Sequence, residues 1–210
     1  MNTPERRPLQ VREQRWAKAI ASWLGRAGAS PNGISLTGML AALLAGAALF
    51  FTTRDEAWSP VLFIAAGVLI QIRLLANMFD GMVALETGKS SPVGELFNEI
   101  PDRVSDAAVL IGAGHAAGSQ LDLGWAAACL ALFIAYIRAE GKVAGAHQDY
   151  GGPMAKQQRM MVVTAAAVAS AFAPAQWLVM TWALVVVLAG GAVTVVLRLA
   201  RIGSALRRKS

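Results

Sequence analysis

Long apolar segments dominate this chain, and their length limits the folds open to it. Of the 210 residues, 56% are hydrophobic and only 15% are charged, whereas a water-soluble domain has about a quarter of its residues charged. Six apolar segments approach the length needed to cross a bilayer. They are expected at residues 33–52, 60–80, 101–118, 123–140, 159–175 and 177–199. The sequence therefore predicts an all-α integral membrane protein with six transmembrane helices.

The third and fifth of these segments, 101–118 and 159–175, are short and rich in Ala and Gly. Small side chains let helices approach closely in a membrane. We therefore expect these two helices inside the bundle.

Basic residues gather on one side of the predicted spans. The net charge of +6 alone is compatible with nucleic acid binding, but the positions of the charges fit membrane orientation better, because cytoplasmic loops are rich in Lys and Arg. Both termini and the even-numbered loops are therefore expected to be cytoplasmic, in the cell inner (plasma) membrane, and no nucleic acid partner is expected. The residues concerned are Arg6, Arg7, Arg12, Arg15, Lys18 and Arg26, then Lys89 and Arg103, then Arg138, Lys142, Lys156 and Arg159, and finally Arg198, Arg201, Arg207, Arg208 and Lys209.

Three regions follow from this organisation. Residues 1–29 form a cytoplasmic segment, residues 30–200 the membrane domain and residues 201–210 a basic tail. Within the first region, residues 8–27 predict an interfacial helix that anchors on the membrane or docks on a partner. Its apolar face would carry Leu9, Trp16, Ile20, Trp23 and Leu24, with Arg12, Arg15 and Lys18 largely elsewhere.

Polar residues at helical spacing interrupt the apolar pattern between residues 73 and 106. One helix face would carry Arg73, Asn77, Asp80, Gly81 and Ala84, and the next helix would carry Gly94, Asn98, Asp102 and Asp106. Residues three and four apart lie on the same side of a helix. We therefore expect two polar faces near the cytoplasmic side, across a shared cavity.

Buried acids of this kind need a compensating charge, because each costs about 2.5–3.5 kcal/mol to insert in a membrane. Asp80 and Asp102 can pair with Arg73 and Arg103, can be protonated, or can bind cations. Carboxylate and carboxamide oxygens suit Mg²⁺ or Mn²⁺. Spacing alone leaves these alternatives open.

The central stretch resembles the signature of the CDP-alcohol phosphatidyltransferase family, D-x-x-D-G-x-x-A-R followed by G-x-x-x-D-x-x-x-D. Here it runs Asn77-x-x-Asp80-Gly81-x-x-Ala84-Leu85, eight residues, then Gly94-x-x-x-Asn98-x-x-x-Asp102. Three further stretches are similar to family segments: SPNGISLTG from residue 30, YIRAEGKVAG from residue 136 and MAKQQRMMVV from residue 154. The resemblance covers most of the chain and implies the family's six-helix fold.

The chain departs from that signature at three positions. Asn77 and Asn98 stand where the family has aspartate, and Leu85 stands where it has arginine. Fewer negative ligands should weaken metal binding. Nearby acids at positions 95, 99 and 106 can compensate, and Arg73 is a candidate to replace the missing arginine charge.

The resemblance implies transfer of a phosphatidyl-type group from a CDP-linked lipid, CDP-diacylglycerol, to an alcohol, with release of CMP, in phospholipid biosynthesis. Asp102, as base for the acceptor hydroxyl, and Asp80 are the implied catalytic residues. Two Mg²⁺ or Mn²⁺ ions are implied, as is a homodimer. The implied metal ligands are Asn77, Asp80, Asn98 and Asp102, and the implied CDP-binding residues are Gly81, Ala84 and Gly94.

The acceptor is less specified. Arg138, Lys142, Lys156 and Arg159 share the predicted cytoplasmic side and can hold a phosphorylated alcohol through charge-assisted hydrogen bonds. Ordinary positive-inside bias explains them equally well. Two other functions remain open: a family member without catalysis that binds a nucleotide-lipid or a partner enzyme, and an ion transporter.

Overall fold

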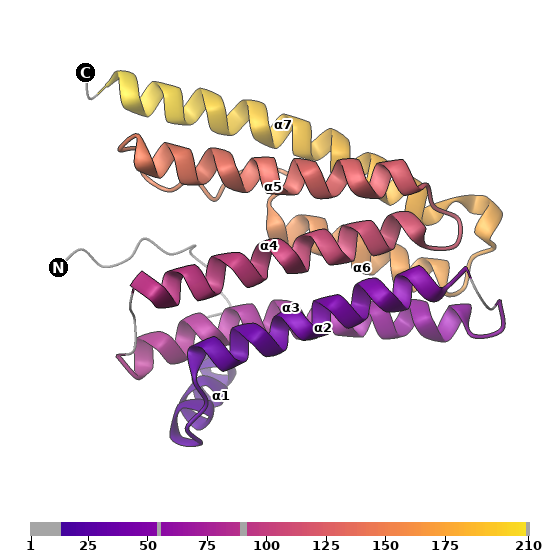
Figure 1. Cartoon of the computed structure of the whole chain (residues 1–210), viewed down its shortest axis with the longest axis horizontal. Helices are drawn as coiled ribbons and strands as arrows, with labels where there is room; N and C mark the ends of the chain where they lie inside the picture. Colours follow the sequence, from indigo (N-terminus) through magenta and orange to yellow (C-terminus); the bar gives the residue numbers. More distant parts are fainter. Residues whose placement is uncertain (1–13, 54–55, 89–91, 209–210) are drawn as a thin grey trace.

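The computed structural model describes residues 14–53, 56–88 and 92–208 (Figure 1). Those ranges contain only helices and connecting segments, which confirms the all-α prediction. The helices are α1 (Arg15–Arg26), α2 (Pro31–Phe51), α3 (Ser59–Glu86), α4 (Pro92–His115), α5 (Leu121–Val143), α6 (Lys156–Ser170), the short 3₁₀ helix η2 (Ala175–Trp177) and α7 (Val179–Arg207).

Four helical segments are long and apolar enough to cross a membrane: α2, α3, α5 and the stretch Ala175–Arg207 that contains η2 and α7. Two of the six predicted spans are absent from this set. α4 is interrupted by the polar motif residues, and α6 has 15 residues, which is about 22 Å of helix against a hydrocarbon core of about 30 Å. The chain is a multi-pass membrane protein, and crossing by α4 and α6 stays a prediction.

The boundaries of α2, α3 and α4 show that the polar motif residues lie within helices. Ser30 caps α2 by accepting a hydrogen bond from the Gly33 N–H at 3.0 Å, and Pro31 occupies the first helical position, both common at helix starts. α3 continues to Glu86, and α4 starts at Pro92, ahead of its apolar part. The motif residues therefore lie on helices, as the spacing predicted.

Glycines set the close packing of α4 at the centre of the bundle. α4 contacts α2, α5, α6 and α7 (Figure 1). A Cβ on Gly46 of α2 would overlap the Ala108 carbonyl group of α4, and one on Gly112 would overlap the backbone of Gly46. The expectation that 101–118 lies inside the bundle is confirmed. α6 packs against α3, α4 and α7.

α1 packs on α3 beside α2 (Figure 1). Ala17 and Ala21 are buried against a cluster that includes Met78 and Val83 of α3. Trp16, Ile20 and Trp23 of α1 are exposed, whereas Leu24 is partly buried against the same cluster. Leu9 and Arg12 lie outside the described residues, and the membrane-surface role of this helix stays a prediction.

Candidate active site

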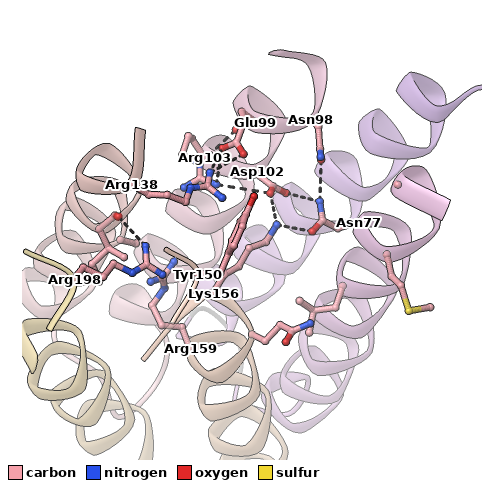
Figure 2. Close-up of a pocket in the computed structure, with 17 residues that line it drawn as sticks. Asn77, Asn98, Glu99, Asp102, Arg103, Arg138, Tyr150, Lys156, Arg159 and Arg198 are labelled. Carbon is pink, nitrogen blue, oxygen red and sulfur yellow. Dashed lines mark hydrogen bonds and ion pairs between the residues drawn. The ribbon is translucent and has the colours of Figure 1, made fainter. Parts of the chain in front are cut away.

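The two polar helix faces lie against each other at one end of the bundle (Figure 2). Asn77 on α3 donates from Nδ2 to Asn98 Oδ1 at 3.2 Å and to Asp102 Oδ1 at 2.9 Å, both on α4. These contacts bring together three of the four motif positions that were expected to act jointly.

Lys156 lies at the centre of this contact. Its ammonium group donates to Asn77 Oδ1 at 2.7 Å and makes a short ion pair with Asp102 Oδ2 (Figure 2).

The segment that precedes α6 determines where that helix begins, and Lys156 is its first residue. Gly152 has φ +131°, and a side chain there would overlap Thr194 of α7. Met154 donates its backbone N–H to Thr194 Oγ1 at 3.0 Å, and α6 begins two residues later. Only glycine combines this backbone conformation with such a close approach, so Gly152 helps to set the position of Lys156.

A second ion-pair cluster lies one helical turn further along α4. Asp106 Oδ1 accepts a hydrogen bond from Arg73 Nη2 at 2.7 Å, and Oδ2 accepts one from Arg159 Nη2 at 2.8 Å. All three side chains are buried. Arg73 Nη2 also lies 3.3 Å from Asp102 Oδ1, so the cluster touches the Lys156 contact. Asp106 is thus compensated by two arginines of the protein.

Asp80 has a different environment. It is buried on α3, and its Oδ2 accepts a hydrogen bond from Ser35 Oγ of α2 at 2.6 Å. Its Oδ1 is buried with no hydrogen-bond partner of normal geometry in the described part of the chain. The pairing of Asp80 with Arg73 considered from spacing is wrong, because Arg73 binds Asp102 and Asp106 instead. Arg103 does reach Asp102, at 3.7 Å.

A cavity opens beside Asp102, and basic side chains outnumber acidic ones in its lining (Figure 2). Arg138 Nη2 lies 2.6 Å from both carboxylate oxygens of Glu99, and the guanidinium lies 5.0 Å from the centroid of the Tyr150 ring. Such a surplus of cations favours an anionic ligand. The lining includes the basic residues Arg103, Arg138, Lys156, Arg159 and Arg198, and the acidic residues Glu99 and Asp102.

The structure separates the other predicted site residues. Arg138, Lys156 and Arg159 line the basic cavity, whereas Lys142 is exposed and borders a neighbouring surface groove. Among the small residues expected to leave room for the nucleotide, Gly81 lines the cavity, Ala84 is buried, and Gly94 lies outside the lining. The roles of all these residues stay predictions.

Three residues of this region were missed as site residues. Arg198 is buried and donates to the carbonyl oxygens of Gly151 at 2.9 Å and Ile134 at 3.0 Å. An arginine inside an apolar stretch was a usable signal, since such residues are rare and usually functional. Ser35 and Tyr150 carry no comparable signal, because nothing in their local sequence links them to Asp80 or to Arg138.

Most side-chain oxygens of the predicted metal ligands already have partners within the protein. Asn77 Oδ1 and Asp102 Oδ2 bind Lys156, Asn98 Oδ1 accepts from Asn77, and both Asp106 oxygens bind arginine. No group of three His, Cys, Asp or Glu side chains suited to a metal ion occurs within the described ranges. Among the oxygens of the four motif positions, Asp80 Oδ1 has no hydrogen-bond partner of normal geometry in the part of the chain that the structure describes.

Comparison with known proteins places these residues in a family context. The family model of the CDP-alcohol phosphatidyltransferases matches residues 29–200. The archaetidylinositol phosphate synthase of Aeropyrum pernix is 31% identical over 178 residues, which are 79% of this chain and 87% of that protein. The phosphatidylinositol phosphate synthase of Mycobacteroides abscessus is 28% identical over 168 residues, which are 75% of this chain and 70% of that protein.

Solved structures show the same fold. The crystal structure of the Mycobacterium tuberculosis phosphatidylinositol phosphate synthase in complex with manganese and citrate matches with a TM-score of 0.69 at 25% identity, over 90% of this chain and 89% of that chain. The structure of the same enzyme with CDP-DAG bound matches with a TM-score of 0.70 at 24% identity, over 90% and 94% of the two chains.

Proposed function

This chain belongs to the CDP-alcohol phosphatidyltransferase family, and we propose that it transfers a phosphatidyl group from CDP-diacylglycerol to inositol phosphate or a similar phosphorylated polyol. The observation that carries this proposal is the basic cavity beside Asp102, at the meeting point of the motif faces of α3 and α4. The reaction belongs to phospholipid biosynthesis and releases CMP.

The acceptor class rests on charge and on the relatives. A phosphate monoester carries close to two negative charges at neutral pH, which suits a cavity with five basic and two acidic lining side chains. Arginine guanidinium groups bind phosphate in a planar, bidentate manner. Arg138, Arg159 and Arg198 would hold the acceptor phosphate. The relatives that synthesise inositol phosphate lipids, by their names, support this choice of acceptor.

In the proposed reaction, the acceptor hydroxyl oxygen attacks the phosphorus atom on the lipid side of the pyrophosphate. A new phosphorus–oxygen bond forms, the bond to CMP breaks, and the hydroxyl proton passes to Asp102. A carboxylate has about four lone-pair sites, and Asn77, Arg73 and Lys156 occupy three of those of Asp102. One lone-pair site of Asp102 therefore remains for the acceptor hydroxyl. A general base must lie within hydrogen-bond reach of the proton that it takes.

We propose a single Mg²⁺ or Mn²⁺ at Asp80, in place of the two ions implied by the motif. The support is the contrast between Asp80 Oδ1, which has no hydrogen-bond partner of normal geometry among the described residues, and the remaining motif oxygens, which are engaged. Mg²⁺ commonly binds through one or two carboxylates together with substrate phosphates. When bound, the ion would neutralise charge on the pyrophosphate.

For the topology, we propose that α4 and α6 cross the membrane with the other four spans, that both termini are cytoplasmic, and that the site faces the cytoplasm of the inner (plasma) membrane. The positive-inside distribution of Lys and Arg supports this orientation. A homodimer and a membrane-surface position of α1 are also proposed. Reporter fusions after residues 54, 88 and 207 would test the orientation, with the first expected outside and the others inside.

The test of the proposed function is CMP release by the purified protein in detergent, with CDP-diacylglycerol, Mg²⁺ or Mn²⁺, and inositol phosphate. Inositol, glycerol phosphate and an acceptor-free reaction are the comparisons. CMP release that needs a phosphorylated acceptor and is lost in Asp102→Asn supports the proposal. Absence of CMP with every acceptor and both metals overturns it.

A second function is favoured by a specific observation. Asn77, Asn98 and Asp102 are already linked by hydrogen bonds to one another and to Lys156. Such a satisfied polar network suits a protein that binds a CDP-lipid without turning it over. Binding of CDP-diacylglycerol without CMP release in the same assay identifies this alternative.

A further inference from the structure

Lys156 makes contacts that phosphate binding alone does not explain. A lysine that serves only an acceptor phosphate would leave its ammonium group free of the motif oxygens that line the same cavity. Instead, its ammonium lies between oxygens of the first and last motif positions, Asn77 Oδ1 and Asp102 Oδ2 (Figure 2). One is a carboxamide oxygen and the other a carboxylate oxygen, and both are ligand types that bind a hard divalent cation.

We propose that the ammonium group of Lys156 takes the place of a divalent cation between Asn77 and Asp102 and binds the pyrophosphate of the donor lipid there. The inference rests on the proposed function and deepens it. Lys156 was predicted to bind the acceptor alcohol, and it is here assigned to the lipid donor, CDP-diacylglycerol. The site would thus combine a protein cation at Lys156 with a metal ion at Asp80.

The charges of the motif agree with this assignment. Asn77 and Asn98 are neutral where the family signature has aspartate, so two negative charges are absent, which is the charge of one divalent ion. The carboxylates left in the motif are Asp80 and Asp102. An ammonium at Asp102 and one divalent ion at Asp80 leave this pair with a surplus of positive charge to offer to a pyrophosphate.

The hydrogen-bonding capacity of Lys156 points the same way. An ammonium group has three N–H donors. Asn77 and Asp102 take two of them, and no further partner of Lys156 is found across residues 14–53, 56–88 and 92–208. Lys156 also lines the cavity. One donor therefore remains for a ligand oxygen.

A purely structural ion pair is the simplest competing explanation. Asp102 already lies 3.3 Å from Arg73 Nη2 and 3.7 Å from Arg103 Nη2, so its charge is compensated without Lys156. Asn77 Oδ1 carries no charge to compensate. Lys156 therefore adds positive charge at a point where folding alone does not require it.

The first test counts bound Mn²⁺ by electron paramagnetic resonance of the free ion, with the full-length protein in detergent and CDP-diacylglycerol present. The triple variant Asn77→Asp/Asn98→Asp/Lys156→Ala restores both carboxylates and removes the ammonium. It is expected to bind about one Mn²⁺ per chain more than the natural protein. Asn77→Asp/Asn98→Asp with Lys156 retained is expected to gain less. Equal counts for the natural protein and the triple variant overturn the inference.

The second test does not depend on folding of the triple variant. Lys156→Ala alone exposes Asn77 Oδ1 and Asp102 Oδ2 to solvent ions, so added Mn²⁺ should raise its unfolding temperature by about 3–5 °C more than that of the natural protein. Lys18→Ala, which removes an exposed lysine of α1, is the matched control and should behave as the natural protein does. Equal Mn²⁺ shifts in Lys156→Ala and Lys18→Ala overturn the inference.

The outcomes also separate this inference from the proposed function. If the triple variant gains an ion while the natural protein releases no CMP with any acceptor, the lysine assignment stands and the transferase proposal fails. If CMP is released but the ion counts are equal, the transferase proposal stands and Lys156 is an acceptor or structural residue.

Discussion

Two buried aspartates close to the site, Asp106 and Asp80, have opposite surroundings. Asp106 has a cationic partner on each oxygen, Arg73 at 2.7 Å and Arg159 at 2.8 Å. Asp80 has one neutral partner, the Ser35 hydroxyl at 2.6 Å, and one buried oxygen without a partner of normal geometry among the described residues. A buried charge that is fully paired supports the fold, whereas one that is left incomplete is available to a ligand.

The largest effect is expected at Asp106, because its loss leaves two buried arginines without a counter-charge. Asp106→Asn should lower the free energy of unfolding by about 3–5 kcal/mol, seen as a large drop in thermal midpoint in detergent. Asp122→Asn, at an exposed carboxylate on α5, is the control and should change stability little. A loss of less than about 1 kcal/mol at Asp106 would show that Arg73 and Arg159 find other partners.

Asp80→Asn should have the reverse profile, a large loss of activity with a folded protein. The substitution keeps the shape and the hydrogen bond from Ser35 but removes the charge that would hold the ion. CMP release should fall about 100-fold or more, equivalent to about 2.7 kcal/mol, while the thermal midpoint stays within a few degrees of the natural protein. Loss of stability as large as that of Asp106→Asn would erase the distinction between the two aspartates.

The sequence predicted the parts of this comparison that depend on helical periodicity. Asn77, Asn98 and Asp102 were expected to meet because their spacing puts them on facing helix sides, and they do. Membrane composition likewise predicted an all-helical chain, and four of the six predicted spans meet the length and composition of a membrane-crossing helix.

Contacts between segments far apart in the chain were not predictable in this way. Lys156 was assigned to the acceptor because it shares the predicted cytoplasmic side with three other basic residues, Arg138, Lys142 and Arg159. Its actual position depends on the approach of Gly152 to Thr194 of α7, a packing detail that one sequence does not encode locally. The partner of Asp80, Ser35, lies 45 residues away, and only the packing of α2 on α3 joins them.

Arg138 is intermediate between the fully paired Asp106 and the incompletely paired Asp80, since it is half-buried and paired with Glu99 at 2.6 Å. Arg138→Gln should raise the KM for a phosphorylated acceptor about tenfold by removing a charge-assisted hydrogen bond, with kcat changed less. Lys142→Gln, at the exposed lysine outside the cavity lining, should alter KM less than about twofold. Equal effects of the two substitutions would indicate a general surface-charge attraction instead of a defined phosphate site. Measurement at two salt concentrations distinguishes these explanations, because surface attraction is screened by salt.

The smallest effect is expected at Ser35, the one side-chain partner seen for Asp80 in the described ranges. Ser35→Ala removes the hydroxyl that donates to Asp80 Oδ2 at 2.6 Å and also lies 3.2 Å from the Pro31 carbonyl oxygen, and it should cost about 1–2 kcal/mol of stability, well below the cost at Asp106. Because a group that orients a metal ligand typically contributes about 10-fold or more to metal affinity, Mn²⁺ affinity measured by titration should fall by about that factor. Thr37→Ala is a suitable control, since Thr37 lies on the same helix and its hydroxyl bonds only to the Gly33 carbonyl among the described residues. If Ser35→Ala lowers stability without changing Mn²⁺ affinity, the Ser35–Asp80 contact belongs to the fold, and Asp80 then resembles Asp106 more than a ligand-binding residue.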